Sequence, residues 1–362
     1  MNRLFALAPG LVLAVALALA GHAIVLALPK LPVSGVTLAI LLGLLLANLT
    51  ALPAAVAEGT RFAVTHILRA GIVLLGLRLS FVDVASIGGA SLPLVVVTIV
   101  AALLIAASLG RALQVPSRLA TLIGVGTGIC GATAIVATSP LIGARNAETG
   151  YAVACIVLCG LAGMLVYPLL AQVLFAGDPL RTGLFLGAAI PDTAQVIGAG
   201  MAYRDYTGDA RPLEVATVTK MTRNLMMLLV IPLLAISSRR AAVEDGRESS
   251  VPRWHEFVPL FVLGFAAMSL LRTLGDAGAG PFAAVDPQAW RWLIETARLA
   301  ADLLLATAMA ALGLSTRLAS LRELGARPLW LAFACMLGLA LVAFLGVELV
   351  VAVSEGWTRT PG

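Results

Sequence analysis

Charged residues are scarce in this sequence. Only 12% of the 362 residues are Asp, Glu, Lys or Arg, whereas 60% are hydrophobic and the mean hydropathy is +1.01. Soluble globular proteins carry about twice that share of charge. The shortage excludes an ordinary soluble protein and predicts a chain embedded in a lipid bilayer. The formal net charge of +5 is spread along the chain, which argues against nucleic-acid binding because such binding needs a concentrated basic patch.

Residues that build metal and catalytic sites are also few. The chain has three histidines and four cysteines, and every cysteine falls in an apolar segment without the spacing of a zinc site or a disulfide framework. Cys130 has no histidine close by in the sequence to act as a base, and no Walker motif is present. The sequence therefore predicts no metal, no cofactor, no enzymatic activity and no ATP-driven transport by this chain alone.

Long apolar runs are abundant instead, and nine of them are close to the roughly 20 residues that span a bilayer as a helix. They cover residues 4–28, 35–52, 62–79, 92–109, 151–175, 215–236, 257–274, 290–314 and 329–353. Two further segments, 118–145 and 181–203, are long enough to span but contain glycine, proline and polar residues. We therefore predict an all-α polytopic membrane protein of about 9 to 11 transmembrane helices, with one transporter domain over residues 1–362.

The distribution of basic residues predicts the orientation. Lysine and arginine collect in the cytoplasmic loops of membrane proteins. With a cytoplasmic N-terminus, the loops expected inside carry most of these residues, and the polar stretch 237–253 becomes a cytoplasmic linker. The first apolar run also has features of a secretory signal, but it is longer than a usual signal core and is predicted to be a span. We expect a multi-pass membrane protein with a cytoplasmic N-terminus.

Two internal echoes indicate related halves. The segment 74–89 matches 311–326 in a Leu-Gly-Leu turn and a later glycine, and the two broken segments share a Thr-Ala-x-Val pattern, at 133–136 and 193–196. Inverted repeats of this kind are common in secondary transporters. If each broken segment dips into the membrane and returns as a re-entrant hairpin, the two enter from opposite sides and the repeat is inverted. If both cross fully, they run parallel, and the sequence leaves the two arrangements open.

The first broken segment, GTGICGATAIVATSP at 126–140, has the composition of an anion-binding nest. A helix interrupted at Gly128, Cys130 and Gly131 leaves N–H groups free, and the positive end of a half-helix attracts anions. Thr127 and Thr133 add hydroxyl donors, and glycine lets a ligand approach the backbone closely. We predict that these five residues bind substrate.

The second broken segment, AAIPDTAQVIGAG at 188–200, follows the same plan. Pro191 interrupts the helix, and Asp192 and Thr193 are suitable N-cap residues for the next one, with Gln195 shortly after. Asp192 either caps this half-helix only or also takes part in transport, since an ionisable group at membrane depth is a functional candidate. Asp192, Thr193 and Gln195 join the predicted substrate site.

A third polar group lies inside the run 215–236. Lys220, Arg223 and Asn224 have the spacing of one helical face, and two cations are too costly to expose to lipid. We predict that this face lines the substrate site; the other interpretation is that the cations pair with Asp192 or extend to the membrane surface. Glu295, Arg298 and Asp302 are spaced to pair along one helix, and Arg78 is expected at the cavity or its mouth.

The segments 126–140 and 188–200, the TRNLMM motif at 222–227 and the LLGLRLS turn at 74–80 resemble the YeiH-type sulfate exporter family. The resemblance covers nearly the whole chain. It implies membership of the bile acid, arsenite and riboflavin transporter superfamily, with about ten helices, inverted repeats, two broken crossing helices, an elevator or rocking motion and a homo-oligomer. The residues carried over are Thr127, Cys130, Thr133, Asp192, Thr193, Gln195, Lys220, Arg223 and Asn224.

These features together predict a secondary active transporter. The resemblance implies that its substrate is a small anion of the sulfate, sulfite or organosulfonate class, moved outward across the bacterial inner membrane; coupling to protons or sodium is left open. The alternative is a cation/proton antiporter that uses Asp192 and Lys220 as the exchanging pair and needs no anion.

Overall fold

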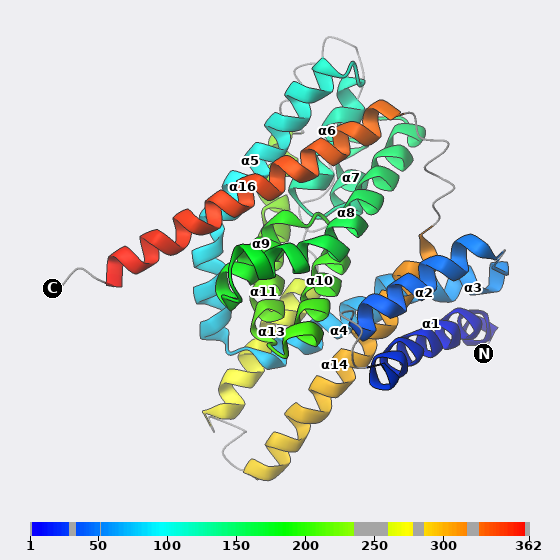
Figure 1. Ribbon diagram of the computed structural model, residues 1–362, viewed down its shortest axis with the longest axis vertical. Coiled ribbons are helices and arrows are strands. Elements are labelled where there is room, and N and C mark those ends of the chain that lie inside the picture. The colour runs from blue at the N-terminus through cyan, green and yellow to red at the C-terminus, as the bar shows by residue number, and fades with distance from the viewer. Residues whose placement is uncertain are drawn as a thin grey trace. The chain divides into compact units, whose positions relative to one another are not determined.

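The structure is a computed structural model, and it describes residues 2–28, 34–50, 52–234, 260–277, 286–316 and 326–358. Within these ranges the chain is helical and contains no strand (Figure 1). The predicted linker 237–253 lies outside the described residues. The elements are α1 (Asn2–Ala27), α2 (Gly35–Leu49), α3 (Ala54–Phe62), η1 (Ala63–Ile67), α4 (Leu68–Leu75), η2 (Gly76–Arg78), α5 (Phe81–Ala112), α6 (Ser117–Gly128), α7 (Ala132–Thr138), α8 (Asn146–Leu174), α9 (Pro179–Ala189), α10 (Thr193–Thr207), α11 (Arg211–Leu225), α13 (Leu260–Asp276), α14 (Pro287–Ser315) and α16 (Ala326–Thr358).

Each of the nine predicted apolar runs has a helix as its main part. Seven helices are long and apolar enough to cross a bilayer, and α2 is a shorter apolar helix. The third run combines α3, η1, α4 and η2 into one segment, Ala54–Arg78. The prediction of an all-α polytopic membrane protein is therefore confirmed for the described part of the chain.

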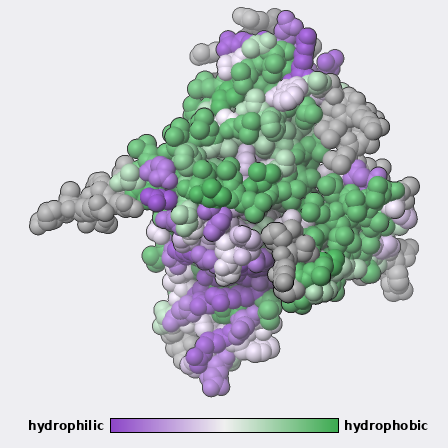
Figure 2. Space-filling model, viewed as in Figure 1, coloured by the Kyte–Doolittle hydropathy of each residue, from purple (hydrophilic) through white to green (hydrophobic). Residues whose placement is uncertain are grey.

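Helix α16 exposes large apolar side chains, as a helix in contact with lipid does. Beyond Trp330 near its start, its exposed large side chains recur at intervals of four residues, close to the helical repeat. They are Phe333, Leu337, Leu341, Leu345 and Leu349. Figure 2 shows a largely apolar surface over α16, as expected for a helix that exposes one side to acyl chains.

The described helices form two compact units. Unit 1 comprises Met1–Ile87, Ile197–Glu214 and Leu260–Ala319, and its core includes small side chains such as Ala14, Ala39 and Ala310. Unit 2 comprises Gly88–Val196, Val215–Pro259 and Ser320–Gly362. The single transporter domain over the whole chain stays a prediction.

The first broken segment is a re-entrant hairpin in unit 2. Helix α6 runs antiparallel to α5, because Ala120 packs against Gly110 and Gly124 packs against Ala106. After the break, the chain returns to the side from which it came: Arg118, at the start of α6, donates to the carbonyl oxygen of Gly143 at 3.0 Å, just before α8 begins. Figure 1 shows α6 and α7 beside α8, consistent with this hairpin.

The second broken segment begins at the opposite end of unit 2. Helix α16 also runs antiparallel to α5, with Gly338 against Ile105 and Gly346 against Leu94. Arg181, in the first turn of α9, lies 3.8 Å from Glu348 near the far end of α16, whereas α6 starts beside the beginning of α16. The two broken segments thus enter unit 2 from opposite ends, which is the inverted arrangement.

Candidate functional site

The two breaks meet inside unit 2. Helix α6 ends at Gly128 and α7 begins at Ala132, while α9 ends at Ala189 and α10 begins at Thr193. We call this place the crossing and define it by residues 126–134, 188–196 and 216–227. Each break leaves one helix C-terminus and one helix N-terminus in the interior, and these carry partial negative and positive charge respectively.

Lys220 binds the carbonyl groups of both breaks. It lies in the span Arg211–Leu234, and the side chain is fully buried. Its Nζ atom donates to the carbonyl oxygens of Ile129 at 2.8 Å, of Ile190 at 3.2 Å and of Pro191. Three acceptors match the three donors of an ammonium group. Lys220 therefore links the two breaks and neutralises the partial negative charge that they present.

Arg223, one helical turn further along, makes the same kind of link and is also fully buried. Its Nε donates to the carbonyl oxygen of Gly128 at 2.6 Å, its Nη1 to those of Ala188 at 2.7 Å and Ile190 at 3.1 Å, and its Nη2 to that of Thr127. Carbonyl oxygens at a helix C-terminus have no partner within the helix, so the guanidinium satisfies groups that the breaks would otherwise leave bare.

These contacts differ from the prediction that the cations face a substrate directly or pair with Asp192. In the described structure, the N–H groups of Lys220 and Arg223 donate to backbone carbonyl oxygens. The physical reason is that two helix C-termini converge on this face, and their carbonyl groups have no partner within their own helices. That Lys220 and Arg223 take part in a substrate site stays a prediction.

The helix N-termini of the crossing are on its more open side. Asp192 caps α10, because its Oδ1 accepts from the backbone N–H of Ala194 at 2.9 Å. The expected cap is therefore present, although both Asp192 and Thr193 remain half-buried and not fully enclosed. Gly131 is the N-cap residue of α7, with φ +65°, and provides no side-chain cap. Its missing Cβ would lie 2.7 Å from Oδ2 of Asp192, so glycine allows this carboxylate to approach.

The hydroxyl and thiol groups of the first break have different roles. The Thr127 hydroxyl donates to the carbonyl oxygen of Ile123 in its own helix at 2.8 Å and is fully buried, so it is not directed at a ligand. Thr133 in α7 is exposed. Cys130 is buried, with Sγ 3.6 Å from Sδ of Met227. Of these three predicted residues, Thr133 alone is exposed.

Two buried amides complete the crossing. Asn224 donates from Nδ2 to the Thr193 hydroxyl at 3.2 Å, and Gln195 donates from Nε2 to the carbonyl oxygen of Val157 at 2.9 Å. The remaining oxygens, Oδ1 of Asn224 and Oε1 of Gln195, are buried without a hydrogen-bond partner among the described residues. All eleven predicted site residues lie in unit 2, so the structure brings the three polar motifs together.

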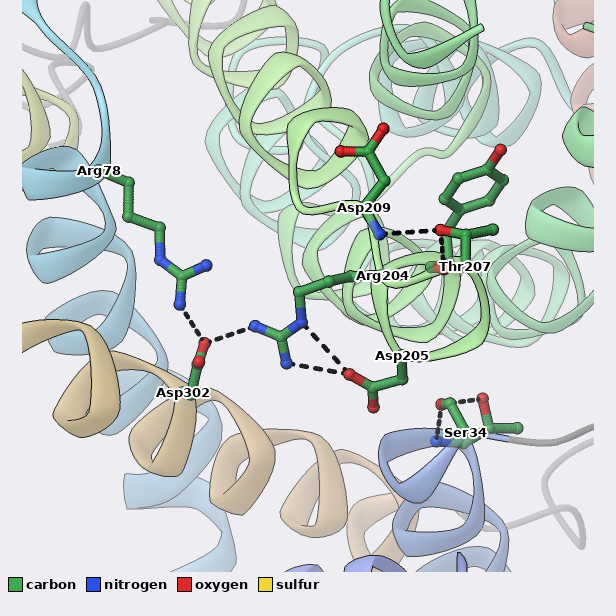
Figure 3. Close-up of polar contacts among 9 residues, drawn as sticks. Ser34, Arg78, Arg204, Asp205, Thr207, Asp209 and Asp302 are labelled. Carbon is green, nitrogen blue, oxygen red and sulfur yellow. Dashed lines mark hydrogen bonds and ion pairs between the residues drawn. The ribbon is translucent and has the colours of Figure 1, made fainter. Parts of the chain in front are cut away.

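Unit 1 holds a separate charge cluster, shown in Figure 3. Oδ1 of Asp302 accepts from Nη2 of Arg78 at 2.6 Å and from Nη1 of Arg204 at 2.7 Å, and Arg204 also binds Asp205. The predicted pairing of Asp302 along its own helix is therefore wrong, because arginines from η2 and α10 are its partners. Sequence reasoning missed Arg204, whose only signal is its position at the end of the second broken segment.

The family described as Conserved hypothetical protein 698 matches residues 9–332. Relatives include a UPF0324 membrane protein of Bacillus cereus (32% identity, 90% of this chain and 89% of the relative) and one of Pseudomonas aeruginosa (34% identity, 90% and 89%). Another, from Streptococcus agalactiae serotype V, is 31% identical over 92% of this chain and 95% of the relative. No solved structure matches. The chain therefore belongs to the Conserved hypothetical protein 698 family, together with these UPF0324 membrane proteins.

Proposed function

We propose that the protein is a secondary active transporter that moves a small anion of the sulfate, sulfite or organosulfonate class outward across the bacterial inner membrane, with its N-terminus in the cytoplasm. The observation that carries the proposal is the charge of the crossing. It contains two cations, Lys220 and Arg223, and one carboxylate, Asp192, so its formal charge is +2 − 1 = +1.

An excess charge at membrane depth is expensive unless something compensates it. Carbonyl dipoles solvate the two cations of the crossing, but they do not cancel a full charge. A small anion would cancel it, and it need not touch the ammonium or guanidinium groups, because charge interactions in a poorly solvated interior reach further than in water. The excess positive charge therefore favours an anionic substrate on the open side of the crossing.

The open side also has suitable donors. The Thr133 side chain is exposed, and Thr193 is half-buried at the first turn of α10, where the helix dipole favours negative charge. The oxygens of a sulfate or sulfonate would accept from these hydroxyls and from backbone N–H groups. The inverted arrangement then supplies a structural basis for alternating access, because each broken segment enters from a different end of unit 2.

A cation/proton antiporter using Asp192 and Lys220 is the second candidate, and one observation favours it. Oδ1 of Asn224 and Oε1 of Gln195 are buried acceptors without partners in the described structure, and such oxygens suit a proton-bearing ligand or a sodium ion. The same atoms are compatible with an anion transporter that is coupled to protons or sodium. We include that coupling, and a homo-oligomeric assembly in the lipid bilayer, in the proposal.

Flux in proteoliposomes tests the proposal. The full chain is reconstituted, and uptake of sulfate, sulfite and methanesulfonate is measured beside proton flux in the absence of any of them. We expect saturable flux of at least one anion, and we expect Thr133→Ala to lower it at least about fivefold through loss of an exposed donor, with an unchanged melting temperature. If none of the three anions shows saturable flux while protons move without them, anion transport is refuted and the antiporter is supported.

A further inference from the structure

The charge cluster of unit 1 has the composition of an anion site that is already filled. Arg78, Arg204 and Asp302 come from η2, α10 and α14, and Figure 3 shows the Asp302 carboxylate between the two guanidinium groups. We propose that Arg78 and Arg204 form a second anion-binding site, for a monoanion with a carboxylate-like or sulfonate group, and that Asp302 occupies this site when the ligand is absent.

Two guanidinium groups share one oxygen of the Asp302 carboxylate. One oxygen, Oδ1, accepts from both arginines, at 2.6 Å and 2.7 Å. Charge-assisted hydrogen bonds of this length are strong, and an oxygen shared by two guanidinium groups is a pattern that oxyanion ligands adopt in arginine-lined sites. A sulfonate oxygen can take the same position without a change in the arginines.

Arg78 has donor capacity that Asp302 does not use. Its side chain is only 7% exposed, and its Nε atom is buried without a hydrogen-bond partner among the described residues. A guanidinium presents donors in a planar fork that binds oxyanions through two oxygens. A ligand with two or three oxygens would satisfy this unused Nε as well as Nη2, whereas Oδ1 of Asp302 alone satisfies only Nη2.

The surroundings allow Asp302 to leave. Its side chain is 32% exposed, so the carboxylate has room to turn away from the arginines, whereas the Arg78 side chain is only 7% exposed. Arg204 is held in place from its other edge, because Nε and Nη2 bind Asp205 at 3.3 Å and 3.0 Å. The site therefore keeps its arginines positioned while its own carboxylate exchanges with an external one.

The charge balance specifies the ligand class. Arg78 and Arg204 contribute two positive charges, and Asp205 and Asp302 contribute two negative charges, so the cluster is neutral. When Asp302 turns away, a net charge of one remains, which a monoanion restores to neutrality. A short sulfonate or carboxylate fits this requirement better than a dianion.

This inference takes one thing from the proposed function, which is the choice of a sulfonate as the probe. The second site lies wholly in unit 1, and the crossing lies wholly in unit 2. Binding to the arginines is therefore measured without transport. Failure of flux in proteoliposomes would refute the proposed function and leave this site untouched, and failure of the binding experiment below would do the reverse.

The experiment removes the Asp302 carboxylate and offers an external sulfonate in its place. In the purified full chain, Asp302→Asn should bind methanesulfonate at least about tenfold more tightly than wild type, because the competing carboxylate is gone. Methanesulfonate should also raise the melting temperature of Asp302→Asn by at least about 2 °C relative to chloride at equal concentration. Because this second readout compares the melting temperature of the same variant in two salts, it is valid even when the substitution lowers stability. We call this gain in melting temperature the rescue.

Two further variants make the test specific. The double variant Arg78→Gln with Asp302→Asn should lose both the added affinity and the rescue. Asp83→Asn removes a carboxylate that pairs with a single half-exposed arginine at 3.6 Å, and it should show no rescue. Equal stabilisation of Asp302→Asn by chloride and methanesulfonate, or a rescue that persists without Arg78, would overturn the inference.

Discussion

Arg223 provides the sharpest test of how the crossing is held together. Its guanidinium donates to four backbone carbonyls, and glutamine at that position has only two amide donors. The carbonyl of Ile190 keeps Lys220 as a donor, so Arg223→Gln leaves at least one buried carbonyl group without a donor. Such a group costs about 1–3 kcal/mol, so the free energy of unfolding should fall by at least about 1–3 kcal/mol. In a thermal unfolding scan this corresponds to a melting temperature at least about 2 °C below wild type.

The matched control is Arg145→Gln. That arginine precedes α8, its side chain is 77% exposed, and it pairs with Glu148 at 3.5 Å. An exposed pair contributes little, so the control should stay within about 0.5 kcal/mol of wild type. If Arg223→Gln and Arg145→Gln unfold at the same temperature, the carbonyl links do not stabilise the crossing and the reasoning fails. Arg223→Gln should also weaken anion binding, because it removes the excess charge.

Two further predictions concern the open side of the crossing. A bound anion repels ionised Asp192, so anion binding should take up a proton and wild-type affinity should fall as pH rises; Asp192→Asn keeps the cap and should abolish this slope in a binding titration across pH. A slope that persists in the variant would make Asp192 a cap only. Gly131→Ala should lower the melting temperature, since φ +65° and the nearby carboxylate leave no room for a Cβ, whereas Gly150→Ala, with open space around it inside α8, should not. Equal melting temperatures for these two variants would contradict the close approach.

The sequence by itself indicated that this protein is surrounded by lipid, and it indicated where its helices are interrupted. Apolar runs near the length of a bilayer crossing predict helices from composition and length alone, because lipid offers the backbone no other partners. The breaks were predictable for the same local reason: glycines at Gly128 and Gly131, and proline at Pro191, interrupt a helix wherever it lies. Lys220, Arg223 and Asn224 were placed on one face by helical spacing.

Only the tertiary structure decided what those residues contact. Every residue carries a carbonyl group, so no sequence pattern indicates that Lys220 and Arg223 bind backbone oxygens of two distant breaks. The same holds for Asp302, whose partners Arg78 and Arg204 lie 224 and 98 residues away, while closer residues along its own helix had the spacing to pair with it. Helical periodicity is a property of one element, whereas these contacts depend on how several elements pack.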